Sequence, residues 1–382
     1  MPNTLPLSTS ISNQRLALLF TVNLVTAAGN TALQSILPAI GTRLNVPDVW
    51  VSLAFSWSAL LWVFAAPLWA RQSDKRGRKA LMALGLIGFT ASMLFSGLAL
   101  WAGLNGWISA IMTFALLALF RTFYGLFGSA APPAVQAYIA ARTEPAERTR
   151  LLSIIASSFG LGTIIGPTLA PFFVAPPFGL ATPNLAFAAI GIIVAIALRL
   201  MLPDDTPRFA ARGSVTAYPA AGGQVNVQDV ATEQDDNPAT AAHAATPADR
   251  ISWLDRRVRN WSIAGLIGGH AQTMVLGVIG FLVMDRLHLR ATPDLAAAPT
   301  GHVLWVGAMA TLLAQWGLIP LLSLSPRACV VSGGVVAGVG TLMLAQADSL
   351  TSISTAVGLS MMGYGLFRPG FTAGASLSVS RA

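Results

Sequence analysis

The stretch Val51–Lys79, VSLAFSWSALLWVFAAPLWARQSDKRGRK, decides the fold because it joins a long apolar run to a strongly charged turn. A helix needs about 20 mainly apolar residues to cross a bilayer, and the run over 49–70 supplies that length. Five cations and one carboxylate then follow within residues 71–79. The pattern is typical of a membrane helix that reaches the aqueous boundary.

The composition extends this interpretation to the whole chain. Of its 382 residues 54% are hydrophobic and only 10% are charged, and the mean hydropathy is +0.65. A soluble domain carries roughly a quarter charged residues, so lipid must cover much of this surface. The net charge is +8, and the basic residues lie in short connections between apolar runs. They therefore form no continuous basic face, which excludes a nucleic-acid-binding protein. Cys329 is the single cysteine, so no internal disulfide is possible.

Similar apolar runs recur along the chain and predict an all-α membrane protein with about ten spanning helices. Each run is long enough to cross a bilayer, and its ends are predicted to within several residues. The runs cover 16–40, 49–70, 80–104, 107–140, 151–175, 184–202, 261–285, 301–323, 327–347 and 352–379.

The connections predict the orientation. With the N-terminus inside, the inner connections carry most of the basic residues and the outer ones carry few, which is the positive-inside pattern. The segment 175–184 is outside in this arrangement and has no charge. The inner residues are Arg71, Lys75, Arg76, Arg78, Lys79, Arg142, Arg148, Arg150 and Arg327, and the outer ones are Arg43, Arg286 and Arg290.

A change of composition divides the chain into three parts. Residues 1–202 hold six runs and 261–382 hold about four, and 203–260 lie between them as a cytoplasmic linker. The linker is rich in Ala, Pro, Gly, Thr and Asp, which is typical of disorder. Tyr-Gly-Leu-Phe occurs at 124–127 and again at 364–367, as expected if the two halves are copies of one unit.

The charged turn also resembles a family motif. Residues 70–79 are similar to the signature loop of the major facilitator superfamily, Gly-x-Leu-Ser-Asp-Arg-x-Gly-Arg-Lys. Ala70 and Gln72 depart from the first Gly and the Leu. The residues that carry the resemblance are Ser73, Asp74, Lys75, Gly77, Arg78 and Lys79.

The same turn has a mechanical interpretation. Asp74 can pair with Arg78 or cap a helix N-terminus, and Gly77 permits a tight turn. Such a cluster of charges can keep the cytoplasmic side of the protein closed, and it can let that side open when the charges rearrange. The alternative is a basic loop that only sets the topology.

Two further stretches resemble motifs of the same superfamily. Arg121 in the fourth run is similar to Arg-x-x-x-Gly-x-x-x-small, and that resemblance implies a part in proton coupling, together with Asp74. Gly162, Gly166 and Pro167 are similar to the antiporter motif of drug:proton exporters, although Ala170 and Pro171 replace its final glycines. The alternatives are an arginine that reaches the outer interface and plain close packing of helices.

Several polar residues within apolar runs are candidates for a substrate cavity. Spacings of three or four residues put the polar residues of the first run on one helix face, which points away from lipid. His270 and Arg368 are further candidates in the second half. The alternatives are interhelical hydrogen bonds for the former and structural roles for the latter. The candidates from the first run are Asn23, Asn30 and Gln34.

The resemblances imply a major facilitator fold and a secondary transporter that exports small molecules in exchange for protons by alternating access. They also imply a monomer in the cell inner (plasma) membrane, with the N-terminus cytoplasmic and no cofactor or metal. Alternatives are an importer or facilitator, or an inactive truncated fragment, since the chain ends two helices short of the family's twelve. An intramembrane enzyme is not indicated, because the four histidines are scattered at 243, 270, 288 and 302.

The charge asymmetry leads to a topology test. Cysteine introduced as Gly179→Cys should react with an impermeant thiol reagent from outside intact cells, and Gly222→Cys should react only after permeabilisation. The parent chain, with Cys329 alone, gives the background. The opposite pattern of labelling would invert the predicted orientation.

Overall fold

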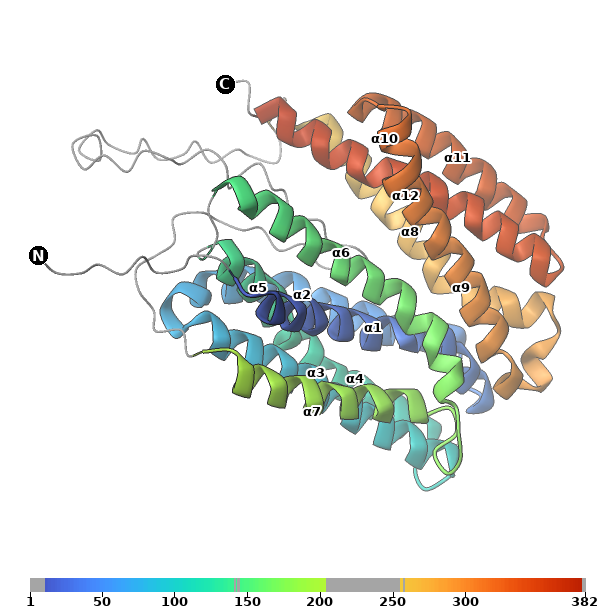
Figure 1. The fold of residues 1–382 in the computed structure, drawn as a ribbon. Helices are drawn as coiled ribbons and strands as arrows, with labels where there is room; N and C mark the ends of the chain where they lie inside the picture. Colours follow the sequence, from blue (N-terminus) through green and yellow to red (C-terminus); the bar gives the residue numbers. More distant parts are fainter. Residues whose placement is uncertain (1–10, 141, 143–144, 204–254, 257, 380–382) are drawn as a thin grey trace, which may run out of the picture. The chain divides into compact units, whose positions relative to one another are not determined.

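A computed structural model of the chain describes residues 11–140, 142, 145–203, 255–256 and 258–379. Helices provide the regular structure of these residues (Figure 1). The first half contains α1 (Asn13–Arg43), α2 (Asp48–Arg76), α3 (Arg78–Leu104), α4 (Ala110–Leu126), η1 (Gly128–Ala130), α5 (Ala131–Ala140), α6 (Pro145–Leu169), η2 (Ala170–Phe173) and α7 (Thr182–Met201). The second half contains α8 (Arg259–Arg286), η4 (Leu289–Ala291), η5 (Pro293–Leu295), α9 (Ala297–Leu312), η6 (Leu313–Leu318), α10 (Ile319–Leu321), α11 (Pro326–Gln346) and α12 (Leu350–Val379).

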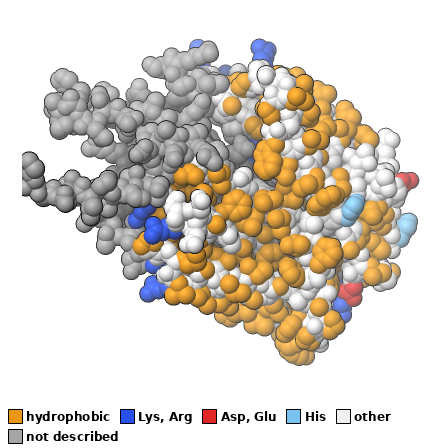
Figure 2. Space-filling view, in the orientation of Figure 1, with side chains coloured by type: hydrophobic (Ala, Val, Ile, Leu, Met, Phe, Trp, Pro, Cys, Tyr) orange, Lys and Arg blue, Asp and Glu red, His pale blue; other side chains and the backbone are white. Residues whose placement is uncertain are grey.

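The all-α membrane fold is confirmed. Within the described ranges, nine helical segments are long and apolar enough to span a bilayer. The fifth predicted run, 151–175, is also helical and forms most of α6, which is not among the nine. Large apolar side chains face outward, including Phe64 at 66% and Ile111 at 84% exposure. Hydrophobic side chains therefore cover much of the face in Figure 2, which suits a lipid surround.

The chain divides into two compact units. Unit 1 comprises Met1–Leu33 and Ile40–Ala231, and unit 2 comprises Gln34–Ala39 and Thr232–Ala382. The helices α2 to α7 lie in the first unit and α8 to α12 in the second. The predicted linker, 203–260, lies for the most part outside the described residues.

Two predicted runs are interrupted in the structure. The run 107–140 becomes α4, the 3-10 turn η1 and α5, because Pro132 and Pro133 lack the N–H groups that would continue the α-helical hydrogen bonds to Gly128 and Ser129. The run 301–323 becomes α9, the π-helix η6 and α10. Pro320 cannot donate to the carbonyl of Trp316, and the backbone changes its hydrogen-bond register just before it.

The first unit is assembled through close contacts between small residues. A side chain at Gly85 would meet Ala131 of α5, and one at Gly97 would meet Leu185 and Asn184 of α7. In α6, Gly162 packs on Leu24 and Ala27 of α1, and Gly166 packs on Ala28 and Thr31 of α1. The small residues of α6 therefore bring its backbone against α1.

The repeated Tyr-Gly-Leu-Phe tetrapeptide has the same packing role in each unit. Gly125 of α4 lies against the Ser58 carbonyl and the Leu61 side chain of α2. Gly365 of α12 lies in the same way against Thr311 and Ala314. Within each unit, the glycine after the tyrosine lets two helices approach closely.

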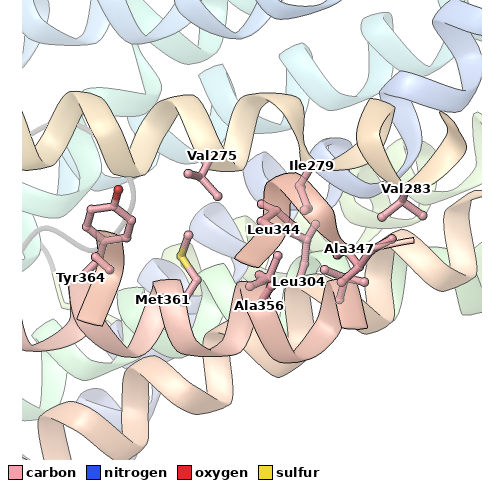
Figure 3. Packing of buried hydrophobic residues seen from close by; sticks show 13 residues of the cluster. Val275, Ile279, Val283, Leu304, Leu344, Ala347, Ala356, Met361 and Tyr364 are labelled. Atoms are coloured by element: carbon pink, nitrogen blue, oxygen red, sulfur yellow. The ribbon is translucent and has the colours of Figure 1, made fainter. Parts of the chain in front are cut away.

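The core of the second unit is apolar. It is formed by side chains of α8, α9, α11 and α12, and Figure 3 shows Val275, Ile279 and Met361 pointing into it. The helices α11 and α12 approach closely at glycines: Gly340 meets the backbone of Ser360, and Gly363 meets the backbone of Ala337. This core contains no charged side chain among its buried members.

The contact between α1 and α6 leads to a stability test with opposite signs at two glycines. A methyl group at Gly166 would overlap the Ala28 carbonyl and crowd Thr31, whereas one at Gly160 would meet nothing within 4 Å. Gly166→Ala should destabilise the protein by about 1–3 kcal/mol through overpacking. Gly160→Ala should be neutral or stabilise it by up to about 1 kcal/mol, because alanine favours helix.

Thermal unfolding of the purified protein in detergent measures both effects. A midpoint that falls for Gly166→Ala and not for Gly160→Ala supports the close approach of α6 to α1. Equal midpoints for the two variants would contradict it.

Candidate functional site

The candidate site is built around Arg121, near the middle of the spanning segment Ala110–Ile139. The side chain of Arg121 is 1% exposed. Its Nη2 donates to Oδ1 of Asn30 on α1 and to Oγ of Ser58 on α2, each at 2.7 Å. An arginine at the centre of a membrane helix costs about 2.5–3.5 kcal/mol on insertion scales. The neutral oxygens of two neighbouring helices offset part of this cost.

Aromatic rings form the walls of the site. The guanidinium carbon of Arg121 lies 5.3 Å from the ring centroid of Phe55 and 5.8 Å from that of Tyr124. Tyr124 in turn packs against Trp62 at 5.1 Å and against Phe89 at 6.2 Å between ring centroids. Cation–π contacts of this kind contribute about 0.5–2 kcal/mol each, so they stabilise the charge without neutralising it.

Two tryptophan side chains hold helices α2 and α4 together at and beyond this site. Trp57 donates from Nε1 to the hydroxyl of Thr122 at 3.0 Å, and Trp69 donates from Nε1 to the carbonyl of Leu126 at 2.5 Å. The close approach at Gly125 lies between these two bonds. The position of Ser58 opposite Arg121 is therefore fixed by several contacts.

Several buried polar atoms in the first unit have no hydrogen-bond partner. Nε and Nη1 of Arg121 are among them, as is Oδ1 of Asn23, a predicted cavity residue on α1. Buried polar groups are normally hydrogen-bonded, and an unpaired one costs several kcal/mol, roughly, inside a membrane. The unpaired N–H donors of the buried Arg121 therefore indicate a binding function.

The structure brings together two of the predicted site residues, Arg121 and Asn30. It does not bring Asp74 to them. At a rise of 1.5 Å per residue, Asp74 lies about 24 Å along α2 from Ser58. The predicted pair for proton coupling, Arg121 and Asp74, therefore belongs to two separate places in unit 1.

The charged turn is a one-residue connection between two helices. Gly77 has φ 86° and separates the end of α2 from the start of α3, so the prediction of a tight glycine turn is confirmed. Arg78 is buried at the first position of α3, and Lys79 donates from Nζ to the carbonyl of Arg199 on α7 at 3.1 Å. The side chains of Ser73, Asp74 and Lys75 lie outside the described part of the structure.

The remaining predicted residues are distributed over several helices. Gly162 and Gly166 face α1, and Pro167 is inside α6, two residues before its end. Gln34 on α1 is partly buried.

In the second unit, His270 is exposed, and its Nδ1 lies 2.8 Å from the carbonyl of Leu266. Arg368 is partly buried on α12 beside Pro369. The carboxylate of Asp285, at the end of α8, forms an ion pair with Arg290.

Several residues of the site were not predicted from the sequence. Ser58 and Phe55 of α2 have no motif of their own, and Tyr124 of α4 stands out only as the first residue of the repeated tetrapeptide. A search for polar residues near the middle of apolar runs would have found Ser58. That search would have missed Asn184, which begins the predicted run 184–202 on α7, is 1% exposed and has two amide atoms without partners.

Across the described residues, no group of three His, Cys, Asp or Glu side chains is placed to hold a metal ion. The polar groups of the site are the guanidinium of Arg121, the amide of Asn30 and the hydroxyl of Ser58, a set suited to binding an anion or a polar ligand. The chemistry that this arrangement supports is binding and release.

Comparisons with known proteins agree with this architecture. Multidrug resistance protein 2 of Bacillus subtilis (strain 168) is 30% identical over 152 residues, which are 40% of this chain and 34% of the relative. The staphyloferrin B transporter of Staphylococcus aureus (strain NCTC 8325 / PS 47) is 26% identical over 206 residues, or 52% of this chain and 46% of the relative. The matched region thus spans less than half the length of these curated relatives.

Solved structures share the fold over nearly the whole chain. A bacterial homologue of the human lysosomal transporter Spinster has a TM-score of 0.64 at 14% identity, covering 97% of this chain and 78% of the other. The xylose transporter XylE from E. coli has a TM-score of 0.62 at 14% identity, with 96% and 89% covered. The family model described as Major Facilitator Superfamily matches residues 19–382. This multi-pass membrane chain therefore belongs to the major facilitator superfamily.

Proposed function

We propose that the chain is a secondary active transporter that exports small molecules across the plasma membrane in exchange for protons, by alternating access. The observation that carries the proposal is the buried Arg121 with its hydrogen bonds to Asn30 and Ser58 and its unpaired donors. A charge retained at this cost in a membrane bundle marks a substrate or ion pathway. The family membership and the multidrug resistance relative, Multidrug resistance protein 2 of B. subtilis, support the same function.

The mechanism assigns separate tasks to separate places in the chain. The half 1–202 and the half 261–382 move relative to one another, with 203–260 as a cytoplasmic linker. Substrate meets polar residues of the membrane-spanning helices, and the proton is coupled through Arg121 and Asp74. The proposed cavity residues are Asn23, Asn30, Gln34, His270 and Arg368. The turn at Ser73–Lys79 gates the cytoplasmic side, where the N-terminus also lies.

The direction of transport rests on α6. Gly162 and Gly166 keep α6 against α1, and Pro167 interrupts the helical hydrogen bonds of α6 just beyond that contact. This combination resembles the antiporter motif and favours exchange of substrate for protons. The alternative is an importer or facilitator on the same fold. The monomer is the proposed functional unit.

Transport by the reconstituted chain tests the proposal. Proteoliposomes with an imposed pH gradient should accumulate a fluorescent drug-like substrate, and dissipating the gradient should stop the uptake. Asp74→Asn and Arg121→Ala should each reduce this flux to background while membrane insertion is retained. Asp48→Asn, at the other end of α2, and Arg199→Ala, at the end of α7, are the matched controls and should keep the flux.

Each alternative has its own outcome. Flux that persists in Asp74→Asn or Arg121→Ala would reject the role of that residue. Flux that is independent of the pH gradient would favour a facilitator. A wild-type chain that inserts but moves no substrate would contradict the proposed activity.

A further inference from the structure

The guanidinium of Arg121 has unused binding capacity. Arginine carries five N–H donors, and the two on Nη2 are directed to Asn30 and Ser58. The three on Nε and Nη1 have no partner, although both atoms are buried. The amide of Asn30 and the hydroxyl of Ser58 are neutral, so they do not balance the positive charge of Arg121.

Among the described residues of the first unit, no carboxylate is placed to supply the missing negative charge. Asp48 is the acidic residue of the first unit whose side chain is described, and it lies about 15 Å from Ser58 along α2 at 1.5 Å per residue. The backbone of Asp74 is about 24 Å from Ser58 in the other direction along α2. Glu147 lies about 28 Å along α6 from Gly166, which packs on α1 beside Ala28.

The charge is not needed to pack the two helices. In the second unit, α12 approaches α9 at Gly365 as α4 approaches α2 at Gly125. Counted from the shared tyrosine, the position of Arg121 corresponds to Met361. Met361 is 3% exposed within an apolar cluster, where Figure 3 shows it beside Tyr364. The same helix pair therefore forms without a cation, and Arg121 is there for another reason.

The surroundings of Arg121 indicate what the ligand is like. Phe55 and Tyr124 present their rings to the guanidinium, and rings of this kind also pack well against a flat apolar body. The unpaired N–H groups attract an acidic oxygen, because charge-assisted hydrogen bonds to arginine are about twice as strong as neutral ones. A ligand that satisfies both features carries a carboxylate on an apolar framework.

We propose that Arg121 is the recognition site for the carboxylate of an organic anion, and that the transported substrates are therefore carboxylate-bearing molecules. This inference rests on the proposed transport function and names its substrate class. The carboxylate accepts hydrogen bonds from Nε and Nη1 of Arg121, and its apolar body packs against Phe55 and Tyr124. Asn30 and Ser58 hold the guanidinium in place for this contact.

Binding of benzoate to the purified full-length chain tests the site, with benzamide as a neutral molecule of nearly the same shape. Isothermal titration in detergent should show saturable binding of benzoate, with benzamide at least about tenfold weaker because it brings no charge to Arg121. Arg121→Gln should weaken benzoate binding by a similar factor. Arg121→Lys, which keeps the charge and loses the planar donor set, should bind benzoate with intermediate affinity.

Controls separate the site from general charge effects. Arg199→Gln removes an exposed arginine at the end of α7 and should leave benzoate binding unchanged. Inorganic phosphate should compete poorly with benzoate, and equal competition would identify a site for inorganic anions and overturn the organic substrate class. Equal binding of benzoate and benzamide to the wild-type chain, or no binding of benzoate, would overturn the inference even if Arg121→Gln failed to fold.

The outcome is separable from that of the transport test. Benzoate binding at Arg121 by a chain that moves no substrate would support the site and contradict the transport function. Proton-driven flux of a neutral or cationic compound, without benzoate binding, would support transport and overturn the anionic substrate class.

Discussion

The bilayer offers no hydrogen-bond partners, and this constraint shapes the whole molecule. Every polar group inside the bundle must be satisfied by another part of the chain or by something that the chain binds. Several buried hydroxyl groups meet the constraint locally: Thr26 and Thr31 of α1, for example, bond to carbonyls of the preceding turn. Arg121 cannot do so, and it draws on α1 and α2 instead. In the first unit, α1, α2 and α4 therefore all contribute to one polar contact.

Close approach between helices is the second consequence of an apolar solvent. Burying a leucine against another helix gains little when lipid is equally apolar, so backbone proximity and packing become decisive. Gly125 and Gly365 illustrate this in the two units, because each places one helix directly on the backbone of another. Both units use this glycine contact, but they differ in the side chain four residues before the glycine. The first unit has the cation of Arg121 there, and the second has the thioether of Met361.

The fold was largely predictable from the sequence, and the site only in part. Apolar runs are read directly because hydropathy is a local property, and the resemblance at 70–79 identified the family. The breaks at η1 and η6 were missed, although Pro132, Pro133 and Pro320 were visible, since the runs around them stay apolar. Arg121 and Asn30 were found because polar residues in apolar runs are conspicuous. Their contact, and the part of Ser58, depend on which helices lie side by side. Nothing within any one run encodes that.

The single residue between α2 and α3 has a mechanical consequence. A peptide chain has two soft rotations per residue, so a joint made of Gly77 alone gives the two helices very few independent ways to turn relative to one another. Most of any bending between them is concentrated in φ and ψ of that glycine, at a left-handed φ that other residues rarely adopt. Lys79 also ties the beginning of α3 to the end of α7. A displacement of the end of α2 is therefore passed on to α3 and α7. The one-residue connection is too short to absorb much of it.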